Sequence, residues 1–317
     1  MRDTVIERFV ALDSAYREHA RRGERLYARF SALAGLSSDI APGILAGQAV
    51  AIRDRLDEGL GLWKSPGKSM RLVFAAALAA SGRSAGNFFD MREALVRRRR
   101  ERGARQLNHG GACAALALIS AGGQPHHADA FYDMLEAIAA PWWRRDAARE
   151  EMIAAIFTAM GETPEEALTR LEAARTALRA AGVPKAHAEA AACEIAVYDF
   201  DPASIAPAWN ELNEAVRRRA SLRHGVGKTG LAVLAAQGQG RATAEALIAS
   251  FEALRALQPR PSADIAAKLA MRLAQAQTGQ STPISAARDL AAILAAQAAM
   301  IAAVTASTAG ATVAATS

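Results

Sequence analysis

The sequence predicts an all-α protein, an α-solenoid-like array of about six helical hairpins, and three observations lead to this prediction. Alanine, leucine and isoleucine carry most of a 51% hydrophobic fraction, whereas aromatic residues supply only 5%. Alanine has the highest helix propensity, and the alternating runs of valine, threonine and tyrosine that are typical of strands are almost absent. The third observation is an apolar, alanine-rich helical pattern that recurs along the chain.

The repeated unit is clearest in residues 65–82, where a turn leads into an apolar helix that stops at a glycine. Six such helices end 38 to 40 residues apart, at Gly82, Gly122, Gly161, Phe200, Gly238 and Gln277. More amphipathic helices lie between them. A repeat of two helices is typical of an α-solenoid, because each hairpin buries its apolar face by stacking on the next. We therefore expect the apolar helices in the better-buried layer.

Three segments follow from this pattern. Residues 1–43 are predicted to be an N-terminal helical segment that is interrupted near Gly23, and residues 44–280 to be the hairpin array. Residues 281–317 are predicted to form a closing helix with an Ala/Thr-rich tail. After Asp289 the segment has no charged residue, and it is long enough to span a membrane. Its alanine content and Gln297 favour a closing helix instead, and no membrane span is expected.

Local signals mark several helix ends. Thr163 is followed by Pro164 and Glu166, which together form a capping box with a proline at the first helical position. Asp201 before a proline repeats the cap, and Gly182 is expected to end a helix.

The charge and cysteine content set bounds on location and partners. The net charge of +6 comes from 38 basic and 32 acidic residues, and this mild excess permits an acidic partner. Two cysteines, Cys113 and Cys193, offer no disulfide framework, and the charged N-terminus lacks the apolar core of a signal peptide. These features favour the cytoplasm.

Two tripeptides resemble the end of a phosphate-binding P-loop, and they are Gly67-Lys68-Ser69 and Gly227-Lys228-Thr229. The motif requires a glycine five residues earlier, where the chain has Leu62 and Leu222. Both tripeptides are therefore interpreted as turns that lead into apolar helices. A helix N-terminus can still contact an anion, and the residues expected to do so are Lys68, Arg71 and Lys228.

No pattern of residues indicates a catalytic site, a metal site or a cofactor. The six histidines lack the spacing that places two imidazoles on one helical face, and His126 and His127 are expected to point apart in an extended loop. Glu150 and Glu151 are interpreted as carboxylates that complement the dipole at a helix start.

Arginines cluster toward the ends of the amphipathic helices and would line one edge of a solenoid. One interpretation is compensation of helix dipoles together with solubility. The other is a ridge that binds RNA, DNA or an acidic protein surface, formed by Arg97, Arg98, Arg99, Arg100, Arg144, Arg145, Arg217, Arg218 and Arg219.

The chain resembles an uncharacterised bacterial family, domain of unknown function 4003. The resemblance rests on residues 63–76 (WKSPGKSMRLVFAA), on the apolar helices that close on glycine, and on residues 297–303 (QAAMIAA). It covers most of the chain and implies a bacterial protein, but it implies no activity and no functional residues.

The hypothesis that follows is a non-enzymatic protein-interaction or scaffold module. The alternative is binding of nucleic acid or another acidic partner along the arginine edge, and an enzyme of unidentified type is the third choice. The first two rest on the repeat and on the arginines, whereas no constellation of residues supports the third.

Overall fold

The computed structural model describes residues 4–36, 38–61, 65–139 and 147–278. Within these ranges fourteen α-helices form seven hairpins, each with an outer and an inner helix, and there is no strand. The outer helices are α1 (Val5–His19), α3 (Pro42–Gly59), α5 (Ala85–Arg102), α7 (Ala128–Ile138), α9 (Pro164–Ala180), α11 (Pro202–Val216) and α13 (Gly240–Ala256). The inner helices are α2 (Ala28–Ala34), α4 (Arg71–Ala80), α6 (Ala112–Ser120), α8 (Ala147–Met160), α10 (Lys185–Ile195), α12 (Ala220–Ala235) and α14 (Ala263–Thr278).

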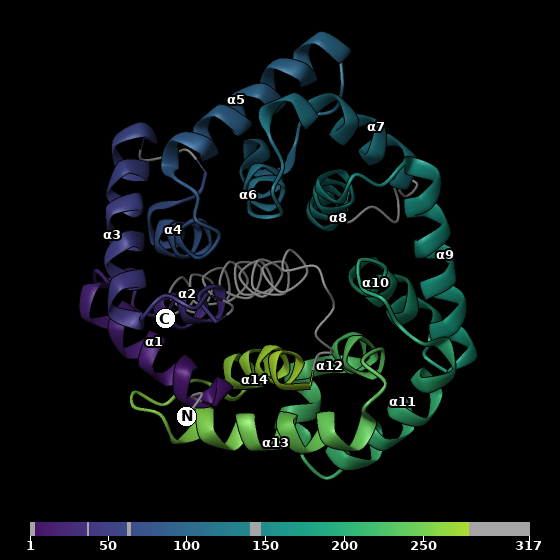
Figure 1. Cartoon of the computed structure of the whole chain (residues 1–317). Helices are drawn as coiled ribbons and strands as arrows, with labels where there is room; N and C mark the ends of the chain where they lie inside the picture. The colour runs from purple at the N-terminus through teal and green to yellow at the C-terminus, as the bar shows by residue number, and fades with distance from the viewer. Residues whose placement is uncertain (1–3, 37, 62–64, 140–146, 279–317) are drawn as a thin grey trace, which may run out of the picture.

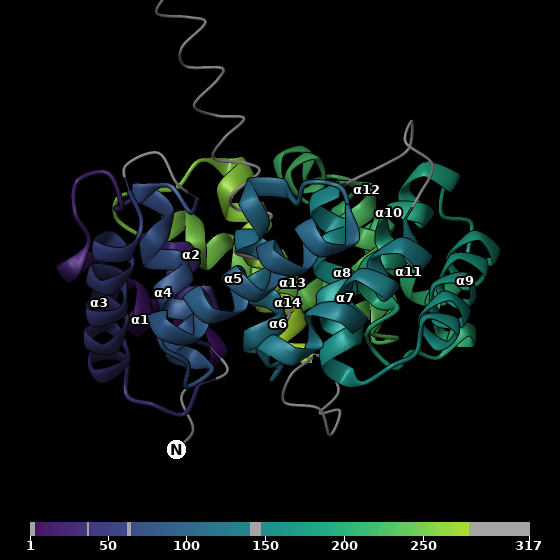
Figure 2. The ribbon, with the colours of Figure 1, turned by 90° about the horizontal axis from the view of Figure 1, so that it is seen from above.

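The hairpins form a closed ring, with the outer helices along its circumference (Figure 1). Seen edge-on in Figure 2, the ring is one hairpin deep, with α3 and α9 at opposite margins. Consecutive inner helices pack side by side, and α14 also packs against α1 and α2. The predicted array of helical hairpins is confirmed. The structure also shows that the first and last hairpins of the array meet.

The N-terminal segment supplies the hairpin at which the ring closes. The interruption expected near Gly23 separates α1 from α2, and these two helices pack on α3 and α4 as the other hairpins pack on their neighbours. The predicted closing helix at 281–317 lies outside the described residues. Among the described helices, α1 and α2 of the first hairpin pack against α14.

The ring closes where the first hairpin meets the last one, at a junction that we call the seam. Two arginines of the first hairpin hold this seam. Arg17 donates to the backbone oxygen of Gln258 at 2.8 Å, and Arg29 donates to that of Pro259 at 2.5 Å. Both carbonyls belong to the connection between α13 and α14. Asp13 lies beside both guanidinium groups, 3.5 Å from Nε of Arg29 and 3.8 Å from Nη1 of Arg17. Asp13 and Arg29 are both buried, so the seam contains a desolvated ion pair.

The apolar helices form the inner layer, as predicted. Every residue of α6 is buried, and so is every residue of α4 except its last. These helices end in the same way, because Gly82 and Gly122 have φ values of 65° and 95°. The next residue after each glycine donates back to the helix, from Arg83 to Leu78 and from Gly123 to Leu118, both at 2.7 Å. This is the Schellman arrangement, which satisfies the last carbonyls of a helix.

The predicted helix signals have the expected geometry. The hydroxyl of Thr163 accepts from the backbone N–H of Glu166, whose carboxylate accepts from the N–H of Thr163 at 2.7 Å. Asp201 caps α11 by accepting from Ala203 at 3.0 Å. Gly182, with φ of 83°, follows the end of α9.

Candidate functional site

The basic residues of this chain are mostly arginines, 33 against 5 lysines, and many guanidinium groups have a structural task. They donate to carbonyls in the connections between helices, where no helical partner exists. Arg92 bonds the oxygens of Ser65 and Gly110, and Arg170 bonds those of Ala196 and Tyr198. Because a guanidinium has five donors in a fixed fork, one arginine can bond several segments of the chain at once.

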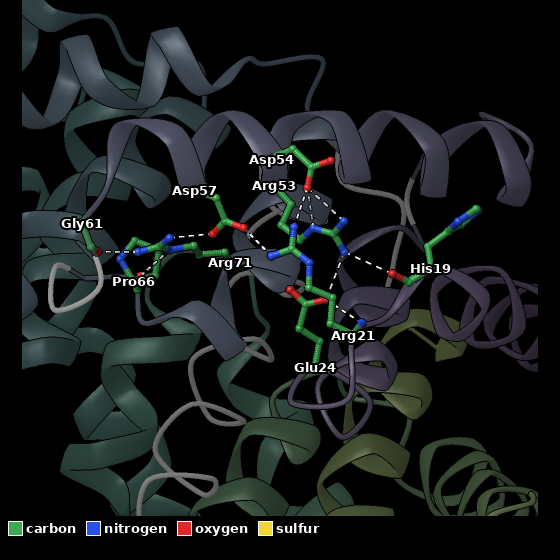
Figure 3. A network of polar contacts seen from close by, with 9 residues as sticks. All are labelled: His19, Arg21, Glu24, Arg53, Asp54, Asp57, Gly61, Pro66 and Arg71. Atoms are coloured by element: carbon green, nitrogen blue, oxygen red, sulfur yellow. Dashed lines mark hydrogen bonds and ion pairs between the residues drawn. The ribbon is translucent and has the colours of Figure 1, made fainter.

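Arg71 belongs to this structural group (Figure 3). Its guanidinium donates to the carboxylate of Asp57 at 2.6 Å and to the backbone oxygens of Gly61 and Pro66 at 2.8 and 3.1 Å. The side chain is 1% exposed. Asp57 also accepts from Arg21, and these two arginines hold the pKa of Asp57 below its usual value despite the opposing effect of burial. The placement favours a structural role over the anion contact expected of Arg71.

The same network continues to Arg53 (Figure 3). Arg53 pairs with the buried carboxylate of Glu24 at 3.0 Å, bonds the backbone oxygen of His19 at 3.1 Å, and contacts Asp54. Arg53 is on α3, whereas Glu24 lies in the connection between α1 and α2. The network therefore fixes the first hairpin on the second.

The arginines at the end of α5 face acidic residues of α7. Arg98 bonds Asp129 at 2.7 Å, and Arg102 bonds Asp129 at 2.8 Å and Asp133 at 2.6 Å. These contacts hold the pKa of Asp129 below its usual value. Arg98 and Arg102 are consequently paired within the protein and join the third hairpin to the fourth.

The second arginine cluster is different, because no member pairs with a described acidic residue of a neighbouring helix. It forms a surface that we call the basic corner, which begins at the short connection from α11 to α12 and continues along α12. Its members are Arg217, Arg218, Arg219, Arg223 and Lys228. Arg217 pairs with Glu214 at 3.4 Å, in a pair of which both side chains are at least 60% exposed. No other corner residue has an ion pair with a described residue.

The structure does not bring all the predicted arginines to one continuous edge. The helix α5, which carries the first cluster, and the helix α11, which leads into the basic corner, lie across the ring from each other (Figure 1). Arg144 and Arg145 lie outside the described residues. Lys68 is exposed at the start of a short 3-10 helix, η1 (Lys68–Met70), that precedes α4. Of the predicted anion contacts, Lys228 is exposed on α12, five residues after Arg223.

A cavity of about 180 Å³ opens on the inner side of the ring. Residues of α2, α8, α10, α12 and α14 line it, so helices from both sides of the seam contribute. Its polar wall comprises Arg149, Glu194, Thr229, Lys268 and Arg272, and its apolar wall includes Phe30, Leu33, Val226, Val233 and Met271. We call this the central cavity.

Two pairs of residues shape the polar wall of the central cavity. Arg272 and Glu194 form an ion pair in which both carboxylate oxygens accept, and the two side chains are 9% and 15% exposed. Thr229 contacts Nδ1 of His187 at 2.9 Å. Glu194 and Arg272 are 78 residues apart in the chain, and no sequence motif marks either of them.

Gly227 interrupts α12 beside this cavity. The predicted turn before a helix takes another form here, because α12 begins at Ala220 and the break is internal. Gly227 has φ of 67° and ψ of 168°, a combination that essentially only glycine adopts. The break re-aims the second half of the helix, where Thr229 and Gly230 line the cavity.

Glu150 and Glu151 lie near the start of α8, as the sequence predicts, and both are buried. Glu151 has no exposed surface, and both of its carboxylate oxygens accept from the backbone N–H of Asn108, at 2.9 and 3.0 Å. Arg105 lies 3.3 Å away. Burial raises the pKa of Glu151 to about 7, against the opposing effects of Asn108 and Arg105. This burial could not be predicted from the sequence, because Arg105 and Asn108, which contact Glu151, precede it by 46 and 43 residues.

The adjacent histidines His126 and His127 are arranged differently from the expectation. His126 and His127 do not point apart, because they lie in a 3-10 helix, η3 (Pro125–His127), where their ring centroids are 4.1 Å apart. Across the described ranges, no group of three or more histidine, cysteine or acidic residues could hold a metal ion. Nor is any helix in the described part long and apolar enough to cross a membrane.

No family model, curated protein or solved structure matches this chain. The resemblance to domain of unknown function 4003 and the cytoplasmic location therefore stay predictions, and the function is argued from the geometry alone.

Proposed function

We propose that this protein is a non-enzymatic binding module and that its basic corner holds an acidic segment of a protein partner. The observation that carries the proposal is the contrast between the two arginine clusters. On α5, Arg98 and Arg102 pair with Asp129 and Asp133 of the neighbouring helix, whereas the corner has five exposed cations and a single paired carboxylate, Glu214, which lies on its own helix α11.

The charge and composition of the corner favour a protein partner over nucleic acid. Five cations within twelve residues create a local positive potential that attracts a run of carboxylates. Residues 217–228 contain no phenylalanine, tyrosine or tryptophan, the side chains on which unpaired bases commonly stack. Arginine also binds carboxylates in a bidentate manner, so an acidic peptide fits this surface well.

A matched pair of triple variants tests the proposal. We expect R217A/R218A/R219A to weaken binding of a fluorescent Asp/Glu-rich peptide by at least about tenfold, since three charge-assisted contacts are lost. The control R97A/R99A/R100A removes the same charge from α5, and its affinity should stay within about twofold of wild type because those contacts are not at the corner. Fluorescence anisotropy at several salt concentrations measures both.

Equal losses in the two variants would show that only net charge matters and would contradict the proposal. A single-stranded RNA that binds more tightly than the peptide, with a steeper salt dependence, would favour the nucleic-acid alternative instead.

A further inference from the structure

An exposed serine adjoins the basic corner and directly follows its run of arginines. Residues 217–221 (RRRAS) are all exposed, and Ser221 is the second residue of α12. We propose that Ser221 is a phosphorylation site for a serine/threonine kinase that recognises arginines before its target, and that the phosphate stops the basic corner from binding an acidic partner. The second part of this proposal rests on the function proposed above.

The arginine run distinguishes Ser221 from every other hydroxyl residue of the chain. Three of the four residues before it are arginines, whereas no other serine or threonine has more than one basic residue among the four before it. Protein kinases select their substrates partly by such charge patterns. Carboxylates in the substrate groove of a kinase bind guanidinium groups in a bidentate manner, so the three arginines would place Ser221 at the active site of such an enzyme.

The position of Ser221 in α12 makes its hydroxyl accessible to a kinase. The helix begins at Ala220, and no side chain caps its N-terminus. The first N–H groups of a helix have no intrahelical acceptor, and helix ends open more readily than helix centres. The chain up to Ser221 can therefore detach locally, whereas the next residue, Leu222, is buried and holds the rest of the helix in place.

The transfer step needs ATP and the kinase as co-reactants. The hydroxyl oxygen of Ser221 attacks the γ-phosphorus of ATP, and a bond forms between these two atoms. The bond from that phosphorus to the β–γ bridging oxygen breaks, so ADP leaves. A carboxylate of the kinase accepts the hydroxyl proton.

The phosphate would compete with an acidic partner for the same arginines. A phosphoserine carries about −1.5 to −2 charges at neutral pH and three strong acceptor oxygens, and here it lies beside the five cations of the corner. It is also in the first turn of α12, where the helix dipole favours an anion. Phosphorylation therefore leaves fewer guanidinium groups to bind a partner, and its negative charge repels the partner's carboxylates.

Labelling of the full chain with Mg-ATP and an arginine-directed kinase, the catalytic subunit of cyclic-AMP-dependent protein kinase, tests the site. Mass spectrometry should find one added phosphoryl group, on Ser221, and S221A should remain unlabelled. R218A/R219A should be labelled at least about tenfold more slowly, because two charge-assisted contacts to the kinase are lost. The control S262A removes another exposed serine, which precedes α14 and follows a single arginine, and should be labelled as wild type is.

Peptide binding by the labelled protein tests the effect on the corner. We expect phosphorylation to weaken binding of the Asp/Glu-rich peptide by at least about tenfold, since the phosphate opposes the carboxylates of the peptide. S221A that has been treated with the kinase should bind the peptide as untreated wild type does.

Three results would overturn the proposal in distinguishable ways. Label on another residue, or no label from a kinase preparation that labels a reference peptide, would overturn the site and leave peptide binding by the unmodified protein unaffected. Peptide affinity that is equal before and after labelling of Ser221 would overturn the switch alone. Unmodified wild type that does not bind the peptide would contradict the proposed function and the switch together, whereas the label on Ser221 is measured without the peptide.

Discussion

Replacing Arg29 with methionine is expected to lower the free energy of unfolding by about 3–5 kcal/mol, the usual effect of removing one partner of a buried ion pair. Arg29 is the buried cation of the ring seam, and it lies between Asp13 and the carbonyl of Pro259. Methionine has a similar length and keeps the packing, but it leaves the carboxylate of Asp13 buried with only Arg17 nearby. Urea denaturation at neutral pH measures the change.

Two further variants distinguish the effect of breaking the seam from the effect of losing a positive charge. R25M removes an exposed arginine from the connection between α1 and α2, four residues before Arg29, and we expect it to change stability by less than about 0.5 kcal/mol. D13N/R29M removes both charges and should be more stable than R29M alone, because no buried charge is then left unpaired. If R29M and R25M are equally stable, the seam is not held as described.

Replacing Glu151 with glutamine is expected to remove a stability loss of about 3 kcal/mol that the wild-type protein undergoes between pH 4.5 and pH 8. Burial raises the pKa of Glu151 from 4.5 to about 7 in the folded protein. A raised folded-state pKa contributes stability that is fully present below the unfolded pKa and is lost as pH rises through the folded value. The wild type should therefore weaken above about pH 5, whereas E151Q should not.

The measurement is the free energy of unfolding of each protein at several pH values, taken as a difference between variant and wild type. His127, whose pKa is lowered mainly by burial, has the opposite pH dependence, but it is present in both proteins and cancels in the difference. E165Q, at an exposed position of α9, serves as the control. Parallel pH curves for wild type and E151Q would show that Glu151 is not desolvated in the folded chain.

The repeat was predictable because it depends on local signals. Each alanine-rich helix, and each cap such as Thr163 or Gly182, depends on residues close to it in the chain. The 38–40-residue spacing appears because these local patterns recur. Closure of the ring was not predictable, because an open array and a closed array have the same sequence pattern of helical hairpins. The seam contact joins Arg17 to Gln258, which are 241 residues apart, and neither residue is unusual in the sequence.

The candidate sites were likewise predictable only where they depend on local sequence. An arginine-rich surface was predicted from the sequence, but the contacts that distinguish the α5 cluster from the basic corner were not. Those contacts depend on α7 lying beside α5, which brings Asp129 and Asp133 to Arg102. The central cavity was missed for a related reason, since its lining comes from five inner helices that meet only when the ring is closed.

Hydrogen exchange of the native protein tests ring closure most directly. In a linear array of repeats the end hairpins have one neighbour and open first, whereas every hairpin of a closed ring has two. We predict that the amides of α1 and α14 are protected to a similar degree as those of α7 and α8, and that R29M lowers protection at the seam before the rest of the ring. Protection in the wild type that falls steadily from α7 and α8 toward both α1 and α14 would contradict the closed ring.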